Sequence, residues 1–571
     1  MEIKVQKVLE YEDVFPGEPF NIEDTLKKYN RELIVRCVCV LGHSYRNAYW
    51  RSSRFFSSIS NNHIRQLNER VILALKKLGV EDICYSTIKT SLELLRITFS
   101  ISPNAFNNTG LDEDFEYDMF RVILKVNSKV FFHKHDDSLL PDELIYFNQF
   151  ATNDTNFAQL HSIFRTQCYY TSEMFGFLEQ YYPDVLSSLL KYWNITDYRK
   201  YILTIYSIFF ICQTQQQKSP RGYWLLDFDE IKIQKGFFCP QVARNLSIDI
   251  NEIIPYSNED TIQGADNIDY KTFRSRPLIR LSENKYYIYN LQLLIERSYN
   301  SLFFDLKQIW NGTGFSDFFN KKFVEYCLFR HTMSLCSNKK DYTFPTNQMI
   351  AEHETNEVPN QPDFYIRRQG TIVLFECKAF KVNGRLKDSV DLQDFLRELK
   401  IKIYEATANI DRSRKTKKKP EPVGVTQLLI EIEKIEDNDF PFDTKIPDNV
   451  EYYPVIVLED SRFILPGLMS IVNKWSKKLF AEKLGRTAYY PIIITSIDIL
   501  FQYSDTFRKK GFPQVINTFF QDNNARLSEN GIDWEINPVA DFNSFIKSKY
   551  KRNSGEKLWL DRYIKRIATN R

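Results

Sequence analysis

The chain has 571 residues, of which 43% are hydrophobic, 26% are charged and 15% are aromatic, and its formal net charge is +3. This composition excludes a disordered or collagen-like chain, and the length predicts roughly two to four domains. Because positive and negative charges nearly balance, the chain is not expected to coat nucleic acid by bulk electrostatics. Any phosphate binding must therefore come from local patches.

Several common sequence signals are missing. The N-terminus has no apolar signal core, and the longest mostly apolar run, residues 201–212, is shorter than the roughly 20 residues of a membrane-spanning helix. The nine cysteines are scattered without a CxxC pair or paired Cys/His spacing, so neither a structural zinc site nor a disulfide framework is predicted. A P-loop sequence is also missing. We expect a soluble, cytoplasmic protein with no membrane partner.

The first 270 residues carry no recognisable chemistry. Residues 1–140 are predicted to form an α+β domain, with buried strands at 33–40 and 120–132 and a helix at 63–78. Residues 141–300 are predicted to form a mostly helical middle region, in which the polar stretch Gln213–Pro220 is the best linker candidate.

Residues 301–571 alternate helical and strand patterns. The spacing of apolar residues predicts helices at about 316–330, 389–408 and 468–483, and strands at 363–366, 371–380, 454–458 and 491–494. This order predicts an α/β fold with a mixed sheet. A final amphipathic helix, apolar at positions 560–567, is expected to pack on a domain.

The two strands at 363–380 are predicted to form a hairpin with a two-residue turn at Gln369-Gly370. In that register Asp363 lies opposite Glu376, and Lys378 lies on the same face. The other face is entirely apolar, with Phe364, Ile366, Val373, Phe375 and Cys377. Two carboxylates and an ammonium group are therefore expected to meet at one end of the hairpin.

Neighbouring carboxylates repel, and a divalent cation between them relieves that repulsion. Mg²⁺ prefers oxygen ligands, and it can polarise a phosphoryl oxygen and lower the pKa of a bound water. Lys378 would orient that water or offset charge on the phosphate. The pattern predicts hydrolysis of a phosphodiester assisted by Mg²⁺, with Mn²⁺ as a substitute. The alternative is a solvated, salt-bridged strand end.

Pro362-Asp363 and Glu376-Cys377-Lys378 resemble the signature of the PD-(D/E)xK superfamily of restriction-endonuclease-like nucleases. The resemblance covers about residues 310–500. It implies an α/β/α core with a mixed sheet, and it implies that Asp363, Glu376 and the backbone carbonyl of Cys377 bind the metal.

Two further residues follow from the same resemblance. Glu325 matches a glutamate on the first core helix that often lies near the metal, although the usual Phe-Glu step is Val-Glu here. Gln427 matches a glutamine that steers phosphate or water, at the start of a helix that Thr426 is predicted to cap. The alternatives are an ordinary helix-surface Glu325 and an ordinary first-turn Gln427.

A basic run precedes Gln427, with Arg412, Arg414, Lys415, Lys417, Lys418 and Lys419. It is either a phosphate-binding clamp or solvated surface.

Together these features predict a Mg²⁺-dependent DNA endonuclease with an N-terminal recognition or regulatory region. By analogy with the superfamily, it resembles restriction or anti-phage defence effectors. The alternatives are a repair or recombination nuclease acting on ends or junctions, and a catalytically inert nucleic-acid-binding or scaffold protein. DNA is favoured over RNA, although contacts to phosphate alone do not separate them. A homodimer or an activating partner protein is also expected.

Overall fold

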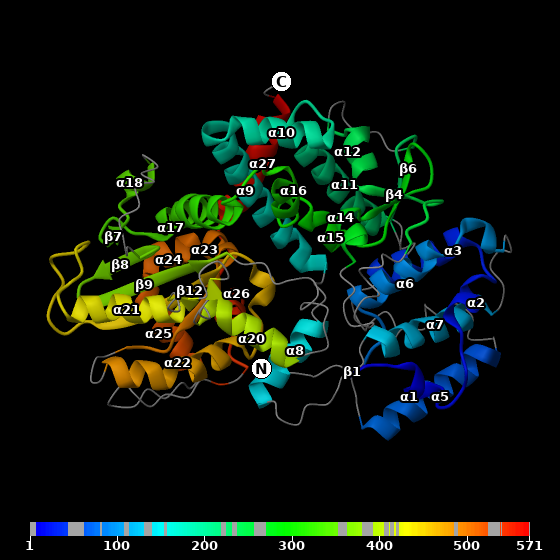
Figure 1. Cartoon of the computed structure of the whole chain (residues 1–571), viewed down its shortest axis with the longest axis horizontal. Helices are drawn as coiled ribbons and strands as arrows, with labels where there is room; N and C mark the ends of the chain where they lie inside the picture. Colours follow the sequence, from blue (N-terminus) through cyan, green and yellow to red (C-terminus); the bar gives the residue numbers. More distant parts are fainter. Residues whose placement is uncertain are drawn as a thin grey trace.

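A computed structural model describes seventeen parts of the chain: residues 7–43, 62–79, 83–107, 114–130, 140–152, 157–218, 224–230, 237–255, 270–351, 362–379, 392–404, 410–411, 416–417, 422–484, 489–523, 537 and 539–569. The fold is mixed α/β, with many helices around a four-stranded and a five-stranded sheet (Figure 1).

The N-terminal region is helical in its described part, apart from a pair of two-residue strands. Its elements are β1 (Lys7–Val8), α1 (Tyr11–Val14), α2 (Ile22–Leu26), α3 (Arg31–His43), α5 (Asn62–Leu78), β2 (Ile83–Cys84), α6 (Ile88–Ser100), η1 (Pro103–Ala105) and α7 (Phe115–Val130). The helix predicted at 63–78 is confirmed as α5. The strands predicted at 33–40 and 120–132 are wrong, because these residues lie in α3 and α7 or, for 131–132, outside the described residues.

The physical reason for this error is burial on several sides. In α7 the residues 118–120, 122–124 and 126–127 are all buried. A helix enclosed in this way shows a nearly continuous apolar run, which periodicity alone does not distinguish from a buried strand.

The middle region is helical as predicted, but it also carries a sheet. Its helices are α8 (Pro141–Thr152), α9 (Phe157–Tyr181), α10 (Pro183–Trp193), α11 (Tyr198–Lys218), α12 (Pro240–Asn245), α14 (Lys271–Ser275) and α15 (Leu291–Glu296). The predicted linker at Gln213–Pro220 is wrong up to Lys218, since α11 continues through it. The last two residues of that stretch lie outside the described residues.

The four-stranded sheet has the order β3-β6-β5-β4, formed by β3 (Trp224–Asp227), β4 (Ser247–Asp249), β5 (Leu278–Arg280) and β6 (Lys285–Ile288). Its side chains alternate between two hydrophobic cores. Tyr286 and Ile288 belong to the core of the C-terminal half, whereas Tyr287 belongs to the core of the N-terminal helices. The sheet therefore joins the two cores, and the boundaries at residues 140 and 300 stay predictions.

The five-stranded sheet carries the candidate site. Its order is β13-β12-β9-β8-β7, with β12 parallel to β9 and β13, and β8 antiparallel to β9 and β7. The strands are β7 (Tyr342–Phe344), β8 (Phe364–Arg368), β9 (Thr371–Lys378), β12 (Glu451–Leu458) and β13 (Ile493–Ser496). The predicted mixed sheet and its four predicted strands are confirmed, and β7 was not predicted.

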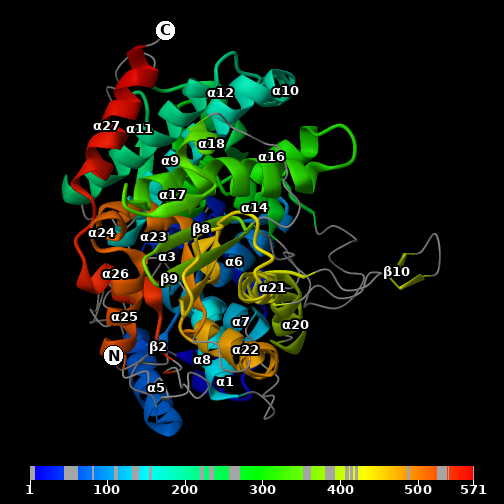
Figure 2. The ribbon, with the colours of Figure 1, turned by 90° about the vertical axis from the view of Figure 1, so that its left-hand side faces the viewer.

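Helices cover both faces of this sheet (Figures 1 and 2). On one face Phe375 packs against Phe329 and Phe512, with ring centroids 6.4 and 4.9 Å away, while on the other Tyr365 packs against Phe440 at 5.2 Å.

The helical elements of this half are α16 (Leu302–Ile309), the π-helix η3 (Asp317–Phe329), α17 (Arg330–Cys336), α18 (Asn347–Ala351), α20 (Leu392–Ile403), α21 (Val425–Glu436), η4 (Ser461–Phe463), α22 (Leu468–Leu484), α23 (Ile497–Gln502), α24 (Ser504–Lys510), α25 (Phe512–Asp522), α26 (Phe542–Lys549) and α27 (Ser554–Thr569).

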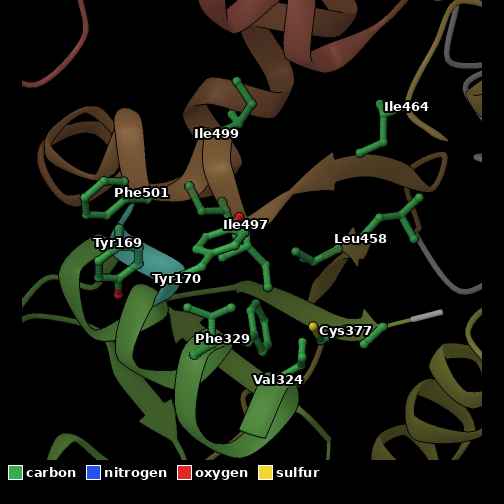
Figure 3. Packing of buried hydrophobic residues seen from close by; sticks show 14 of the residues in the cluster. Tyr169, Tyr170, Val324, Phe329, Cys377, Leu458, Ile464, Ile497, Ile499 and Phe501 are labelled. Carbon is green, nitrogen blue, oxygen red and sulfur yellow. The ribbon is translucent and has the colours of Figure 1, made fainter. Parts of the chain in front are cut away.

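One core runs from the middle region into the C-terminal half (Figure 3). Tyr169 of α9 stacks on Phe501 of α23 with centroids 3.9 Å apart, and the predicted C-terminal helix α27 packs on α9 and α11. Within the described ranges, every helix falls short of the length and apolar character that a membrane span requires.

Candidate active site

The β8–β9 hairpin has the predicted turn and register. Phe364 pairs with Phe375, and Arg368 pairs with Thr371 across the Gln369-Gly370 turn. Gln369 has a φ of 53°, the left-handed conformation that such a two-residue turn requires. The side-chain alternation therefore places Asp363, Glu376 and Lys378 on one face, as expected.

These three side chains converge at the end of the hairpin. The Lys378 ammonium lies 2.8 Å from a Glu376 carboxylate oxygen and 4.0 Å from a carboxylate oxygen of Asp363. The side chains of Asp363 and Lys378 are 13% and 14% exposed, whereas Glu376 is buried. The group is thus reachable from solvent on the side of Asp363 and Lys378.

Cys377 connects the two strands through its backbone. Its N–H donates to Asp363 Oδ2 at 2.8 Å, while its side chain is buried in the core on the opposite face. Because a strand residue directs its N–H and C=O to the same edge, we expect the Cys377 carbonyl to face the same side as Asp363. This direction suits the predicted ligand role of that carbonyl.

The protonation of the group follows from burial and from its charges. Burial, together with the charge of Asp363, raises the pKa of Glu376 to about 8 against the opposing effect of Lys378. Burial alone would lower the pKa of Lys378, but the charges of Glu376, Asp363 and Glu325 outweigh it and raise that pKa. Without a cation, Glu376 therefore holds its proton near neutral pH, while Lys378 keeps its charge.

Glu325 lies within electrostatic reach of this group. It belongs to η3, which packs on β9. Burial raises its pKa well above the ordinary value, the charge of Asp363 adds to this, and Lys378 partly offsets it. The helix predicted from the resemblance thus brings its glutamate to the carboxylates, although as a π-helix, a form that is frequent at functional sites. Its role as a metal ligand stays a prediction.

Glu431 was not predicted, and it joins the same group. It is a buried residue of α21, and its carboxyl group hydrogen-bonds with that of Glu376. Burial and the charges of Glu376 and Asp363 raise its pKa well above the ordinary value. Its Oε2 has no hydrogen-bond partner in the described part of the chain. The sequence signal was an acidic residue inside the apolar stripe of Leu428, Ile432 and Ile435.

Gln427 has a capping role. Its Oε1 accepts a hydrogen bond from the Gly424 N–H at 2.8 Å, and Gly424 is the N-cap of α21. The predicted cap at Thr426 is wrong, because Thr426 lies inside the helix and its hydroxyl bonds to the backbone of Val423. The hypothesis that Gln427 steers phosphate or water stays a prediction.

Arg330, at the start of α17, is a second unpredicted residue near the site. Its guanidinium stacks over the Tyr326 ring at 4.1 Å. Burial lowers its pKa, and the charges of Asp363 and Glu325 act in the opposite direction. Its Nε and Nη2 are buried and unbonded within the described ranges. A positive charge thus lies within electrostatic reach of Asp363 and Glu325.

The basic run contributes little to the described structure. Five of its six cations lie outside the described residues, namely Arg412, Arg414, Lys415, Lys418 and Lys419. The sixth, Lys417, belongs to the strand β11 (Thr416–Lys417), which pairs with β10 (Ile410–Asp411). Figure 2 shows β10 away from the five-stranded sheet. The predicted phosphate clamp is therefore not brought to the carboxylates by the described residues.

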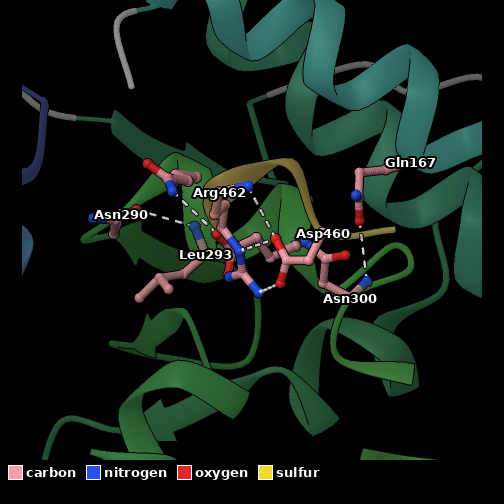
Figure 4. Close-up of polar contacts among 8 residues, drawn as sticks. Gln167, Asn290, Leu293, Asn300, Asp460 and Arg462 are labelled. Atoms are coloured by element: carbon pink, nitrogen blue, oxygen red, sulfur yellow. Dashed lines mark hydrogen bonds and ion pairs between the residues drawn. The ribbon is translucent and has the colours of Figure 1, made fainter. Parts of the chain in front are cut away.

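A separate polar cavity lies beyond the end of β12, and Figure 4 shows the polar contacts of two of its lining residues, Asp460 and Arg462. Its volume is about 40 Å³, and its lining includes Tyr170, Glu459, Arg462 and Asp498. Such a volume holds only a few water molecules and is far below the roughly 300–1,000 Å³ of ligand pockets. We therefore assign no substrate to this cavity.

The oxygen donors that the structure describes near the hairpin are of the chemical type that a hard divalent cation prefers, although their ligand atoms do not form a compact group like that of Glu173, Cys327 and His331. The carboxyl groups of Asp363, Glu376 and Glu325 and the Cys377 carbonyl supply only oxygen, which Mg²⁺ and Mn²⁺ prefer. A cation among them would also relieve the repulsion that keeps protons on the buried glutamates. Comparisons with family models, curated proteins and solved structures gave no match to this chain.

Proposed function

We propose that the protein is a metal-dependent nuclease that hydrolyses phosphodiester bonds, with DNA as its substrate and Mg²⁺ as its cofactor. The observation that carries the proposal is the convergence of Asp363, Glu376 and Lys378 at a solvent-reachable strand end. Burying several carboxyl groups side by side is costly, and a divalent cation would offset that cost.

The residues have distinct proposed roles. Asp363, Glu376, Glu325 and the Cys377 carbonyl would hold the ion, which would polarise the phosphate and lower the pKa of a bound water. Lys378 orients the attacking water and stabilises charge on the phosphate oxygens, since it keeps its positive charge beside Glu376. Glu431 keeps its own proton beside Glu376 until the ion binds.

The resemblance to the PD-(D/E)xK superfamily supports an endonuclease that acts in restriction or anti-phage defence in the cytoplasm. On this proposal the N-terminal helices and the four-stranded sheet recognise the target, bind an activating partner or form a dimer. These assignments are analogies with the superfamily.

Cleavage assays on the full chain test the proposal. Purified protein is incubated with closed circular DNA, linear DNA, branched DNA or RNA, in Mg²⁺, Mn²⁺ or EDTA. We expect metal-dependent cleavage of circular DNA, and a loss of at least about 100-fold in Asp363→Asn, Glu376→Gln and Lys378→Met. Asp394→Asn is the matched control, because Asp394 is an exposed acid paired with Arg397 on α20, and it should cut like the wild type.

Each alternative has its own outcome. Cleavage confined to ends or junctions would favour a repair or recombination nuclease over the defence endonuclease. Binding without cleavage in every metal would indicate an inert nucleic-acid-binding protein. If the variant that combines all three substitutions cuts as well as the wild type, the assignment of the site is wrong.

A further inference from the structure

A second group of metal-ligand side chains lies on the other side of η3. It consists of Glu173 on α9, Cys327 on η3 and His331 on α17. The Nδ1 atom of His331 is 2.8 Å from Glu173 Oε2 and 4.0 Å from Cys327 Sγ. One potential ligand atom from each residue lies within 4.8 Å of the others.

Two helices hold these side chains in place. Cys327 and His331 are four residues apart where η3 continues into α17, so they lie on the same side of the helix. Helix α9 packs against η3 and presents Glu173 to that side. Glu325 lies only two residues before Cys327, but it lies near Asp363 instead. The π-helix thus carries one candidate ligand toward each of two sites.

The donor atoms distinguish this group from the carboxylate site. Sulfur, nitrogen and oxygen together suit Zn²⁺ or Co²⁺, whereas Mg²⁺ prefers oxygen alone. An ion pair alone would account for the short contact between Glu173 and His331. It would not account for the Cys327 thiol, which lies beside the same ring nitrogen of His331. The side chains of His331 and Glu173 are 27% and 24% exposed, so an ion can enter from solvent, while Cys327 forms the buried end.

We propose that Glu173, Cys327 and His331 bind one Zn²⁺ ion, with water as the fourth ligand. On binding, the Cys327 thiol releases its proton to solvent and its sulfur becomes a thiolate ligand. The ion then ties α9 to the helix that carries Glu325. Sequence analysis predicted no zinc site because the glutamate comes from a distant segment, so the three ligands form no compact motif.

The test uses the full chain after removal of metals by a chelator, in an excess of Mg²⁺ that occupies the carboxylate site. Titration with Co²⁺ is expected to give a sulfur-to-cobalt charge-transfer band that saturates at one equivalent, and Zn²⁺ should displace the Co²⁺. Zn²⁺ should also raise the unfolding temperature. Cys327→Ser should abolish the band, and His331→Asn and Glu173→Gln should weaken Zn²⁺ binding at least about 10-fold.

Two controls isolate the site. Cys336→Ser changes another buried cysteine, whose thiol donates to the Leu500 carbonyl, and it should keep the full Co²⁺ band. Asp363→Asn should also keep the band, because Asp363 does not belong to this group. The zinc site and the proposed nuclease function can therefore be tested separately. Binding that is unchanged in His331→Asn, whose partly exposed position tolerates substitution, would overturn the proposal. Failure of the wild type to bind Co²⁺ and Zn²⁺ at micromolar concentration would also overturn it.

Discussion

Two clusters of charged side chains lie at the carboxyl ends of the neighbouring strands β9 and β12. Beyond β12, the Arg462 guanidinium contacts Asp460 at 2.5 and 2.8 Å and Glu296 at 2.8 Å (Figure 4). At the end of β9, the Lys378 ammonium lies 2.8 Å from Glu376 and 4.0 Å from Asp363, and Glu325 and Glu431 lie close by.

The two clusters differ in how many carboxyl groups share one cation. In the Arg462 cluster each carboxylate contacts the same guanidinium, so the ions satisfy one another and stabilise the packing of η4 on α15. In the β9 cluster, burial and mutual repulsion raise the pKa values of the glutamates. The Arg462 cluster thus has two carboxylates in direct contact with its cation. The β9 cluster has four carboxyl groups near Lys378, and on the proposed function a bound metal ion would complete it.

The largest effect is expected from a substitution in the Arg462 cluster. Arg462→Ala leaves the Asp460 and Glu296 carboxylates without their partner, and we expect it to lower the free energy of unfolding by about 3–5 kcal/mol. Denaturant unfolding measures this change. The control Arg397→Ala removes an exposed partner of Asp394 and should cost about 1 kcal/mol or less. Equal losses in the two variants would contradict the comparison.

A pH dependence is expected from the β9 cluster without metal. Burial raises the pKa of Glu376 from its ordinary 4.5 to about 8, so the folded state keeps a proton that the unfolded state loses. The free energy of unfolding contributed by this group is therefore fully present below about pH 4.5 and falls as the pH rises toward 8.

Thermal unfolding in EDTA at several pH values measures this trend. Glu376→Gln should flatten it, because the amide does not titrate. For the same reason the affinity for Mg²⁺ should rise with pH over this range, since the ion binds the ionised carboxylate. A wild type and a Glu376→Gln variant with parallel pH profiles would count against the raised pKa.

A smaller effect is expected from Glu431→Gln. This change removes one carboxyl group from the β9 cluster, so it should raise the stability of the metal-free protein and weaken Mn²⁺ binding about 10-fold. Calorimetric titration measures the affinity. Glu433→Gln on the same helix is the control, because Glu433 instead pairs with Lys483, and its Mn²⁺ affinity should match the wild type.

The smallest effect is expected from Gln427→Ala. The loss of the hydrogen bond from Gly424 should lower the free energy of unfolding by about 1 kcal/mol. If Gln427 only caps the helix, the variant should cleave at a rate within a few-fold of the wild type. Denaturant unfolding and the plasmid assay measure both quantities. A loss of 100-fold or more in the rate, with the fold intact, would support the hypothesis that Gln427 steers phosphate or water.

Sequence patterns were reliable where neighbouring residues constrain one another. The register of β8 and β9 follows from a two-residue turn and from strict alternation, because a shift by one residue would expose the apolar face. Asp363, Glu376 and Lys378 could therefore be grouped in advance. For α3 and α7 the same kind of pattern gave a wrong prediction, because the sequence of a helix buried on several sides resembles that of a buried strand.

By itself, the sequence determined the hairpin, four of the five strands of its sheet, and the three polar side chains at the hairpin end, because all of these depend on patterns among residues close in the chain. Only the tertiary structure decided that Glu431 joins Glu376, that Arg330 lies within electrostatic reach of Asp363 and Glu325, and that Glu173 meets Cys327 and His331. These groups come from different helices, and the packing of those helices on the sheet and on α9 is what brings their side chains together.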